Sequence, residues 1–163
     1  MEIVKYGVEI SDSKLNVLVK ENTYNYGSQF FNKPGIIVDM LNTVFHAGRQ
    51  AEEHVWLLAI NNSCEVLGVF EVCHGSVSEA SVHMREIFVR LCLCGATGFI
   101  LAHNHPGNSL APSEADIRMT GKVTEAATLM GIKLFDHIII CKNGYMSLAE
   151  EGTNNFIRVS FLR

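Results

Sequence analysis

Several features that would assign the chain to a broad class are missing from its 163 residues. No apolar run approaches the roughly 18 residues that a membrane-spanning helix requires. The N-terminal residues lack the layout of a signal peptide. We therefore expect a cytoplasmic protein that does not associate with membranes. Lysine and arginine form no run and the formal net charge is −4, which argues against non-specific binding to nucleic-acid phosphates.

The spacing of the cysteines argues against two kinds of zinc protein, those with a structural Cys-x2-Cys site and the zinc deaminases. The five cysteines are an odd number, and no two of them have the Cys-x2-Cys spacing typical of a structural zinc site. We expect free thiols in a reducing compartment. The same absence argues against a zinc deaminase, because those sites combine a His or Cys with a Pro-Cys-x-x-Cys pair.

Strand-like and helical segments alternate along the chain, which has the length of one domain with or without a small extension. Internal repeats and low-complexity segments are absent. Strands are expected at residues 3–10, 15–19, 55–60, 65–73, 99–102, 132–134, 137–140 and 145–148. The first two strands could form an edge hairpin or a flexible arm. A first helix is expected to begin at Pro34, with Asn32 as N-cap, and to stop at Gly48. Two more helices are expected at 82–93 and 113–130. The inward face of the last one is expected to consist of residues 117, 120, 123, 127 and 130. This alternation predicts an α/β fold with a mixed sheet.

One loop carries a pattern typical of a metal site. His103 and His105 lie two apart at the end of an apolar strand, so their side chains point to the same side, about 6–7 Å apart. Pro106 and Gly107 then turn the chain, and Asp116 follows at a helix start. Three protein ligands and one open position are typical of a catalytic zinc site.

Structural roles compete with this interpretation at several positions. Ser113 and Asp116 have the spacing of a capping box, which would fix the Asp116 rotamer and is compatible with metal binding. The Ser113 hydroxyl could also donate to an oxyanion. The other histidines of the strands and helices are expected to be ordinary core or surface residues: His54, His74, His83 and His137.

A hydrolytic zinc site also needs a general base, and a carboxylate is expected because both histidines would be ligands. The candidates are Glu52, Glu53, Glu65, Glu71, Glu79 and Glu86. If the strand that begins near Glu53 runs antiparallel to 99–103, Glu53 lies beside the histidines. Strand alternation would turn Glu52 the other way.

The order His103-x-His105, seven residues, Ser113, two residues, Asp116 resembles the JAMM (MPN-plus, JAB) metalloprotease signature at every fixed position. The surrounding segments resemble the RadC-like subfamily: residues 81–86, 99–106, 112–113, 116–118 and 136–139. Pro106-Gly107-Asn108 departs from the Pro-Ser-Gly that is usual there, without a change in loop length.

The resemblance implies a cytidine-deaminase-like three-layer sandwich, with a mixed β-sheet flanked by helices. It implies that His103, His105 and Asp116 hold zinc and that Ser113 stabilises the tetrahedral intermediate. The upstream glutamate of the family, which acts through a zinc-activated water, falls on Glu53. The activity implied is hydrolysis of a peptide or isopeptide bond in a protein or peptide substrate.

The resemblance spans residues 34–152, so we expect an arm of strands at 1–33, the RadC-like JAMM domain at 34–152 and a tail at 153–163. Full-length relatives carry a helix-hairpin-helix region expected to touch DNA, and residues 1–33 show no such pattern. Direct nucleic-acid binding is therefore not expected. The alternative function is a non-catalytic, metal-binding accessory protein in DNA repair, replication or mobile-element biology. The apolar stretch 156–162 could dock on its own sheet or on a second copy, as in a homodimer.

Overall fold

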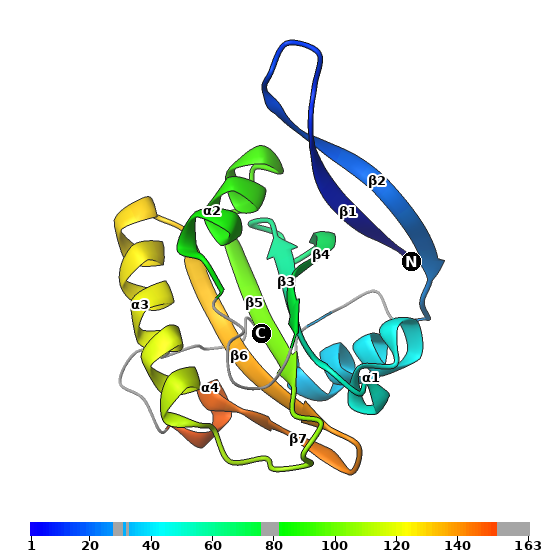
Figure 1. The fold of residues 1–163 in the computed structure, drawn as a ribbon, viewed down its shortest axis with the longest axis vertical. Coiled ribbons are helices and arrows are strands. Elements are labelled where there is room, and N and C mark those ends of the chain that lie inside the picture. The colour runs from blue at the N-terminus through cyan, green and yellow to red at the C-terminus, as the bar shows by residue number, and fades with distance from the viewer. Residues whose placement is uncertain (28–30, 32, 76–81, 153–163) are drawn as a thin grey trace.

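The computed structural model describes residues 1–27, 31, 33–75 and 82–152. A seven-stranded mixed sheet of order β2-β1-β4-β3-β5-β6-β7 forms the middle layer (Figure 1). The strands are β1 (Glu2–Ile10), β2 (Asn16–Asn25), β3 (Glu53–Ile60), β4 (Val66–Gly75), β5 (Gly98–Asn104), β6 (Lys133–Cys141) and β7 (Gly144–Ser147). The helices are α1 (Pro34–Phe45), α2 (Met84–Leu93), α3 (Glu114–Met130) and the short α4 (Leu148–Glu151), with a 3-10 turn η1 (Ala47–Arg49). The expected three-layer α/β sandwich is confirmed.

Strand alternation divides the core into two halves. On β3, Trp56 and Leu58 pack with α1 on one face of the sheet, whereas Val55 and Leu57 pack with α2 and α3 on the other. All four side chains are buried. A strand buried on both faces needs a near-continuous apolar sequence, which residues 55–60 supply.

The N-terminal strands form an edge hairpin rather than a flexible arm. β1 and β2 pair antiparallel, and β2 continues to Asn25, well past the expected end. A single register pair, Lys5 with Val69, joins β1 in parallel to β4. The Lys5 ammonium also binds Glu71 on β4 at 3.0 Å. The hairpin therefore extends the sheet and projects beyond it (Figure 1).

Helix ends differ from the sequence expectation at α1. The helix ends at Phe45 because His46 adopts the left-handed conformation (φ 55°), and Gly48 lies in the following 3-10 turn. The residue at the N-cap is Lys33, without a side-chain cap. Asn32 lies outside the described residues.

On α3, Thr120, Val123 and Ala127 face inward as expected, but two predicted core residues do not. Ile117 and Met130 are 39% and 51% exposed. Ile117 follows the buried Asp116 by about 100° around the helix, and Met130 is the last helical residue. The helix begins after the Ser113 N-cap and ends at Met130, as predicted, with Gly131 as its left-handed C-cap.

β6 is one strand and not two. Its pairing with β5 is interrupted by a bulge at Phe135. Phe99 pairs with Leu134 and the next residue, Ile100, pairs with Asp136, so Phe135 has no partner on β5. Within the described part of the chain, no helix combines the length and hydrophobicity needed to cross a bilayer. The predicted tail at 153–163 and the residue Glu79 lie outside the described residues.

Candidate metal centre

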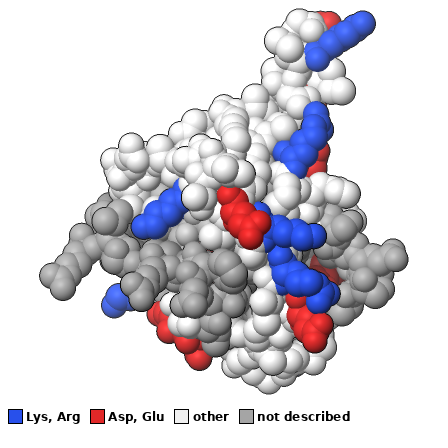
Figure 2. Space-filling model, turned by 90° about the vertical axis from the view of Figure 1, so that its left-hand side faces the viewer, with Lys and Arg blue, Asp and Glu red and all other residues white. Residues whose placement is uncertain are grey.

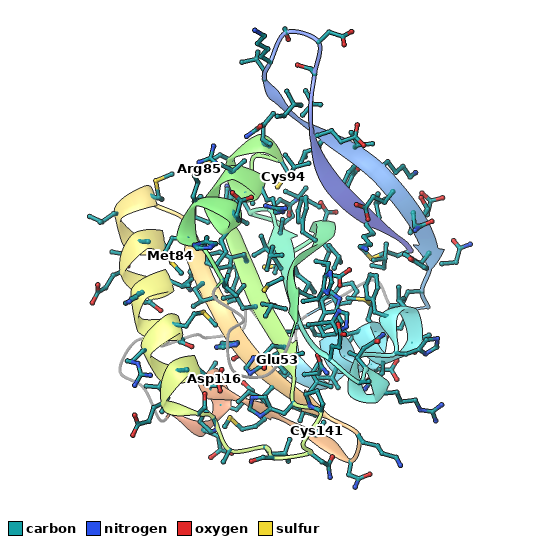
Figure 3. The ribbon with its side chains drawn as sticks, in the orientation of Figure 1. Glu53, Met84, Arg85, Cys94, Asp116 and Cys141 are labelled. Carbon is teal, nitrogen blue, oxygen red and sulfur yellow. The ribbon has the colours of Figure 1, made fainter. Side chains whose placement is uncertain are left out.

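Four side chains from three elements converge at one end of the sheet. Glu53 begins β3, His103 lies on β5, His105 follows that strand directly, and Asp116 is in the first turn of α3. One possible ligand atom from each lies within 4.8 Å of all the others. Figure 3 shows Glu53 and Asp116 close together at this end of the sheet, although they are 63 residues apart in sequence.

The antiparallel pairing of β3 with β5 brings the glutamate to the histidines. Val55 lies opposite His103, so the side chain of Glu53, two residues earlier, is on the same face. Glu52 is not part of the cluster; its carboxylate lies 3.6 Å from His74 and is 63% exposed. The antiparallel arrangement on which the sequence argument for Glu53 depended is therefore confirmed.

The distances within the cluster fit a tetrahedral metal ion. Ligand atoms held 2.0–2.1 Å from zinc at tetrahedral angles are about 3.3 Å apart. The Nε2 atoms of His103 and His105 are 2.9 Å apart. The Asp116 oxygens lie 3.3 Å from His103 Nε2 and 3.5 Å from His105 Nε2. Two imidazoles and a carboxylate at these separations are a donor set that zinc accepts.

The first turn of α3 holds Asp116 in place. Ser113 caps the helix: its Oγ accepts the Asp116 N–H at 3.1 Å, and its backbone N–H and hydroxyl both donate to Asp116 Oδ2 at 2.7 Å. The predicted capping box is present in full. Capping therefore orients the carboxylate toward the histidines, so the two interpretations of this pair coexist.

The electrostatics of the cluster are strongly coupled. Burial raises the pKa of the Asp116 carboxyl, but hydrogen bonds from His103 and His105 outweigh burial and hold it well below its usual range. The hydrogen bond to Asp116 raises the pKa of His105. Burial raises the pKa of Glu53; the charge of His103 opposes this shift and that of Asp116 adds to it. Asp116 is thus held in its ionised form, whereas Glu53 sits in a setting that favours its protonated form.

Asn104, between the two histidines, ties β5 to the start of β3. Its Oδ1 accepts the backbone N–H of His54 at 2.7 Å, and its Nδ2 donates to the carbonyl of Glu52 at 2.9 Å. These two bonds hold the residues on either side of Glu53, from the side opposite to the cluster. Asn104 is 1% exposed, so the contact is sheltered from water.

The remaining candidate glutamates are occupied elsewhere. Glu71 binds Lys5 and His54, at 3.0 and 2.6 Å, and Glu86 pairs with Arg90 on α2. Glu65 accepts a hydrogen bond from Asn61 in the β3–β4 turn. None of these three belongs to the cluster of ligand atoms found among the described residues.

Sequence reasoning missed residues that contact the cluster from behind. His137, expected to be an ordinary core residue, is fully buried, and its Nε2 lies 2.8 Å from His103 Nδ1. Thr120 was placed inward only as a packing residue. The helical spacing of Asp116 and Thr120, one turn apart, was the available signal that Thr120 lies close to the site.

The outer surface on the side of α3 carries both signs of charge. Figure 2 shows Lys and Arg side chains interspersed with Asp and Glu. On the helices, Arg90 and Arg118 pair with Glu86 and Glu114, four residues earlier in each case. The described residues on this face therefore present no continuous basic strip of the kind that nucleic-acid backbones bind.

Comparison with known sequences gives one family. A family model described as "RadC-like JAB domain" matches residues 31–153. A UPF0758 protein of Desulforudis audaxviator is 44% identical over 100 residues, 61% of this chain and 44% of the relative. One from Porphyromonas gingivalis is 42% identical over 102 residues, 62% of this chain and 45% of the relative.

A third relative aligns along most of the chain. The UPF0758 protein of Carboxydothermus hydrogenoformans is 33% identical over 152 residues, 93% of this chain and 60% of the relative. The chain thus spans about half the length of the curated relatives it matches. The family match contains Glu53, His103, His105, Ser113 and Asp116, and its extent shows that the chain belongs to the RadC-like JAB domain family.

Proposed function

We propose that this chain is a zinc-dependent hydrolase of the JAMM type that cleaves an amide bond, peptide or isopeptide, in a protein or peptide substrate. The observation that carries the proposal is the convergence of Glu53, His103, His105 and Asp116 within 4.8 Å. Two histidines and one aspartate would bind the ion and leave a position open. When bound, zinc supplies Lewis acidity and lowers the pKa of a water ligand to near 7.

Glu53 is the general base in this proposal. His103 and His105 engage their Nδ1 atoms with His137 and the Ser109 carbonyl and turn Nε2 to the cluster, so neither can carry a proton between reactants. Within the described residues, Glu53 is the member of the cluster whose carboxylate makes no hydrogen bond. It is 8% exposed and faces the other three. It would take a proton from water and pass it to the leaving amine.

Ser113 is the proposed donor to the oxyanion. Its hydroxyl now donates to Asp116 Oδ2, and turning toward a substrate oxygen would end that bond. The Ser113 backbone N–H also donates to Oδ2, at 2.7 Å. Asp116 would therefore keep its orientation while the hydroxyl turns, which suits a group that serves the substrate only during reaction.

The test uses the full chain and two substitutions with opposite consequences. We expect the wild type to bind about one zinc per chain, measured by mass spectrometry of the metal after gel filtration. His103→Ala should lose the metal. Glu53→Gln should keep it but hydrolyse about 10²–10⁴-fold more slowly, because it cannot accept a proton. Substrates are a fluorogenic peptide library and peptides branched through a lysine isopeptide bond.

Each outcome separates the alternatives. A metal-free wild type, or full hydrolysis by Glu53→Gln, contradicts the proposal. Retention of zinc by the wild type and Glu53→Gln without cleavage of either library favours the non-catalytic, metal-binding accessory function. Loss of zinc in Glu53→Gln would identify Glu53 as a fourth ligand, and hence a closed, structural site.

A further inference from the structure

A chain of three buried hydrogen bonds runs behind His103. His103 Nδ1 lies 2.8 Å from His137 Nε2, and His137 Nδ1 lies 2.6 Å from Thr120 Oγ1. Thr120 Oγ1 in turn donates to the backbone carbonyl of Asp116 at 2.6 Å. His103, His137 and Thr120 are each at most 1% exposed. The chain thus starts at the backbone of one proposed metal ligand and ends at the ring of another, without access to water.

The Asp116 carbonyl sets the direction of every hydrogen in this chain. A carbonyl oxygen only accepts, so the single hydroxyl hydrogen of Thr120 points toward it. The Thr120 oxygen can then only accept from His137, whose Nδ1 must carry its hydrogen. His137 is fully buried, and its ring nitrogens are hydrogen-bonded to Thr120 Oγ1 and His103 Nδ1 and not to a carboxylate. A buried charge without a carboxylate partner is costly, so the ring is neutral and has one N–H. Its Nε2 therefore accepts, and the hydrogen between the two rings belongs to His103 Nδ1.

This order leaves the lone pair of His103 on the atom that faces the cluster. Nε2 is the atom 2.9 Å from His105 Nε2 and 3.3 Å from Asp116 Oδ1. In the reverse order, Thr120 would donate to His137, His137 would donate to His103 Nδ1, and the hydrogen of His103 would sit on Nε2. That hydrogen would point at the position of the ion and block coordination.

We propose that Thr120 and His137 are positioning residues that hold His103 in the Nδ1–H tautomer, with Nε2 ready to bind a metal ion. The inference rests on the proposed metal site but not on hydrolysis. Hydrogen bonds that fix the tautomer and orientation of a ligand histidine typically change metal affinity 10–100-fold. Here the fixing partner is a second histidine whose own tautomer is set by a helix carbonyl.

The helix supplies a matched control for the key substitution. Thr124 and Thr128 make the same bond as Thr120, donating to the carbonyl four residues earlier, at 2.8 Å each. The carbonyls that accept these bonds belong to Thr120 and Thr124, neither of which is a member of the cluster. Replacing Thr124 by Val therefore removes the same type of hydroxyl from the same helix, one turn away from the chain of hydrogen bonds.

The experiment measures zinc affinity of the full chain by competition with a chromophoric chelator. Thr120→Val should weaken zinc binding about 10–100-fold, and Thr120→Ser, which keeps the hydroxyl, should stay within about threefold of wild type. Thr124→Val should match wild type. Circular dichroism checks that each variant is folded. Nitrogen-15 NMR of the imidazoles in the metal-free wild type should show His103 protonated at Nδ1.

The tautomer measurement keeps the inference testable apart from the variants and from catalysis. His103 protonated at Nε2 in the metal-free wild type would overturn it, even if Thr120→Val fails to fold. Equal zinc affinities of folded Thr120→Val and Thr124→Val would overturn it as well. A wild type that binds zinc without hydrolysing any substrate contradicts the proposed activity and leaves this inference standing.

Discussion

Asn104→Ala tests whether the contact between β5 and the start of β3 holds the proposed base in place. The substitution removes both hydrogen bonds that bracket Glu53, to the His54 N–H and the Glu52 carbonyl. It changes none of the three proposed ligands. We therefore expect lower stability and slower hydrolysis with unchanged zinc content.

The magnitude follows from the burial of the amide. A hydrogen bond between neutral groups contributes about 1 kcal/mol net, and a buried partner left unsatisfied costs about 1–3 kcal/mol. Asn104 is 1% exposed, so water replaces its amide poorly. With two such bonds, we expect the free energy of unfolding to fall by about 2–4 kcal/mol.

The assay is urea unfolding of the metal-free protein in a chelator, so that zinc binding does not add to the apparent stability. Asn61→Ala is the matched control. Asn61 likewise makes two side-chain bonds to the backbone, since its Oδ1 accepts two N–H groups at 2.9 and 3.0 Å, but in a partly exposed turn. We expect it to cost less than about 1 kcal/mol, because water can replace those bonds. Equal losses in the two variants would refute the role assigned to Asn104.

Two further predictions concern stability alone. Burial raises the pKa of Asp136 to about 6, so its contribution to the free energy of unfolding is complete below the unfolded pKa of about 4 and falls by about 3 kcal/mol as pH rises through 6 to about 7. Asp136→Asn should abolish that decline, seen as a pH-dependent difference from wild type in urea unfolding; a constant difference would contradict it. Gly48→Ala would place a Cβ 2.8 Å from the Cys141 carbonyl oxygen, and the shift of backbone should cost about 1–3 kcal/mol in thermal unfolding. Wild-type stability in that variant would show that the close approach is relieved without cost.

The sequence predicted which candidate ligands converge better than it predicted the residues around them. The ligand pattern is local: two residues of one strand end and one helix start within fourteen residues, so alternation and capping rules were enough to place His103, His105 and Asp116. Glu53 required one long-range assumption, the antiparallel pairing of β3 and β5. The sequence left that pairing as a condition, and the register of Val55 with His103 satisfies it.

What could not be predicted depends on contacts between segments distant in sequence. His137 and Asn104 look like ordinary strand residues until β6 and β3 are placed beside β5. The end of α1 was also misplaced. Gly48 was the expected stop, but the helix ends at Phe45 because His46 adopts the left-handed conformation, which is more usual for glycine. Ile117 is exposed because it follows the buried Asp116 by one residue, about 100° around the helix.

The bulge at Phe135 decides which side chain of β6 meets the candidate metal centre. With uninterrupted alternation after Leu134, Asp136 would fall opposite Leu101 and on the face of His103, while His137 would turn to the side of α1. The extra residue exchanges the two. A neutral ring therefore lies behind His103 in place of a carboxylate, and Asp136 instead accepts the Ser147 hydroxyl at 2.6 Å. Pairing of this strand without the bulge, at unchanged length, would thus place a carboxylate behind the candidate site and leave every proposed ligand untouched.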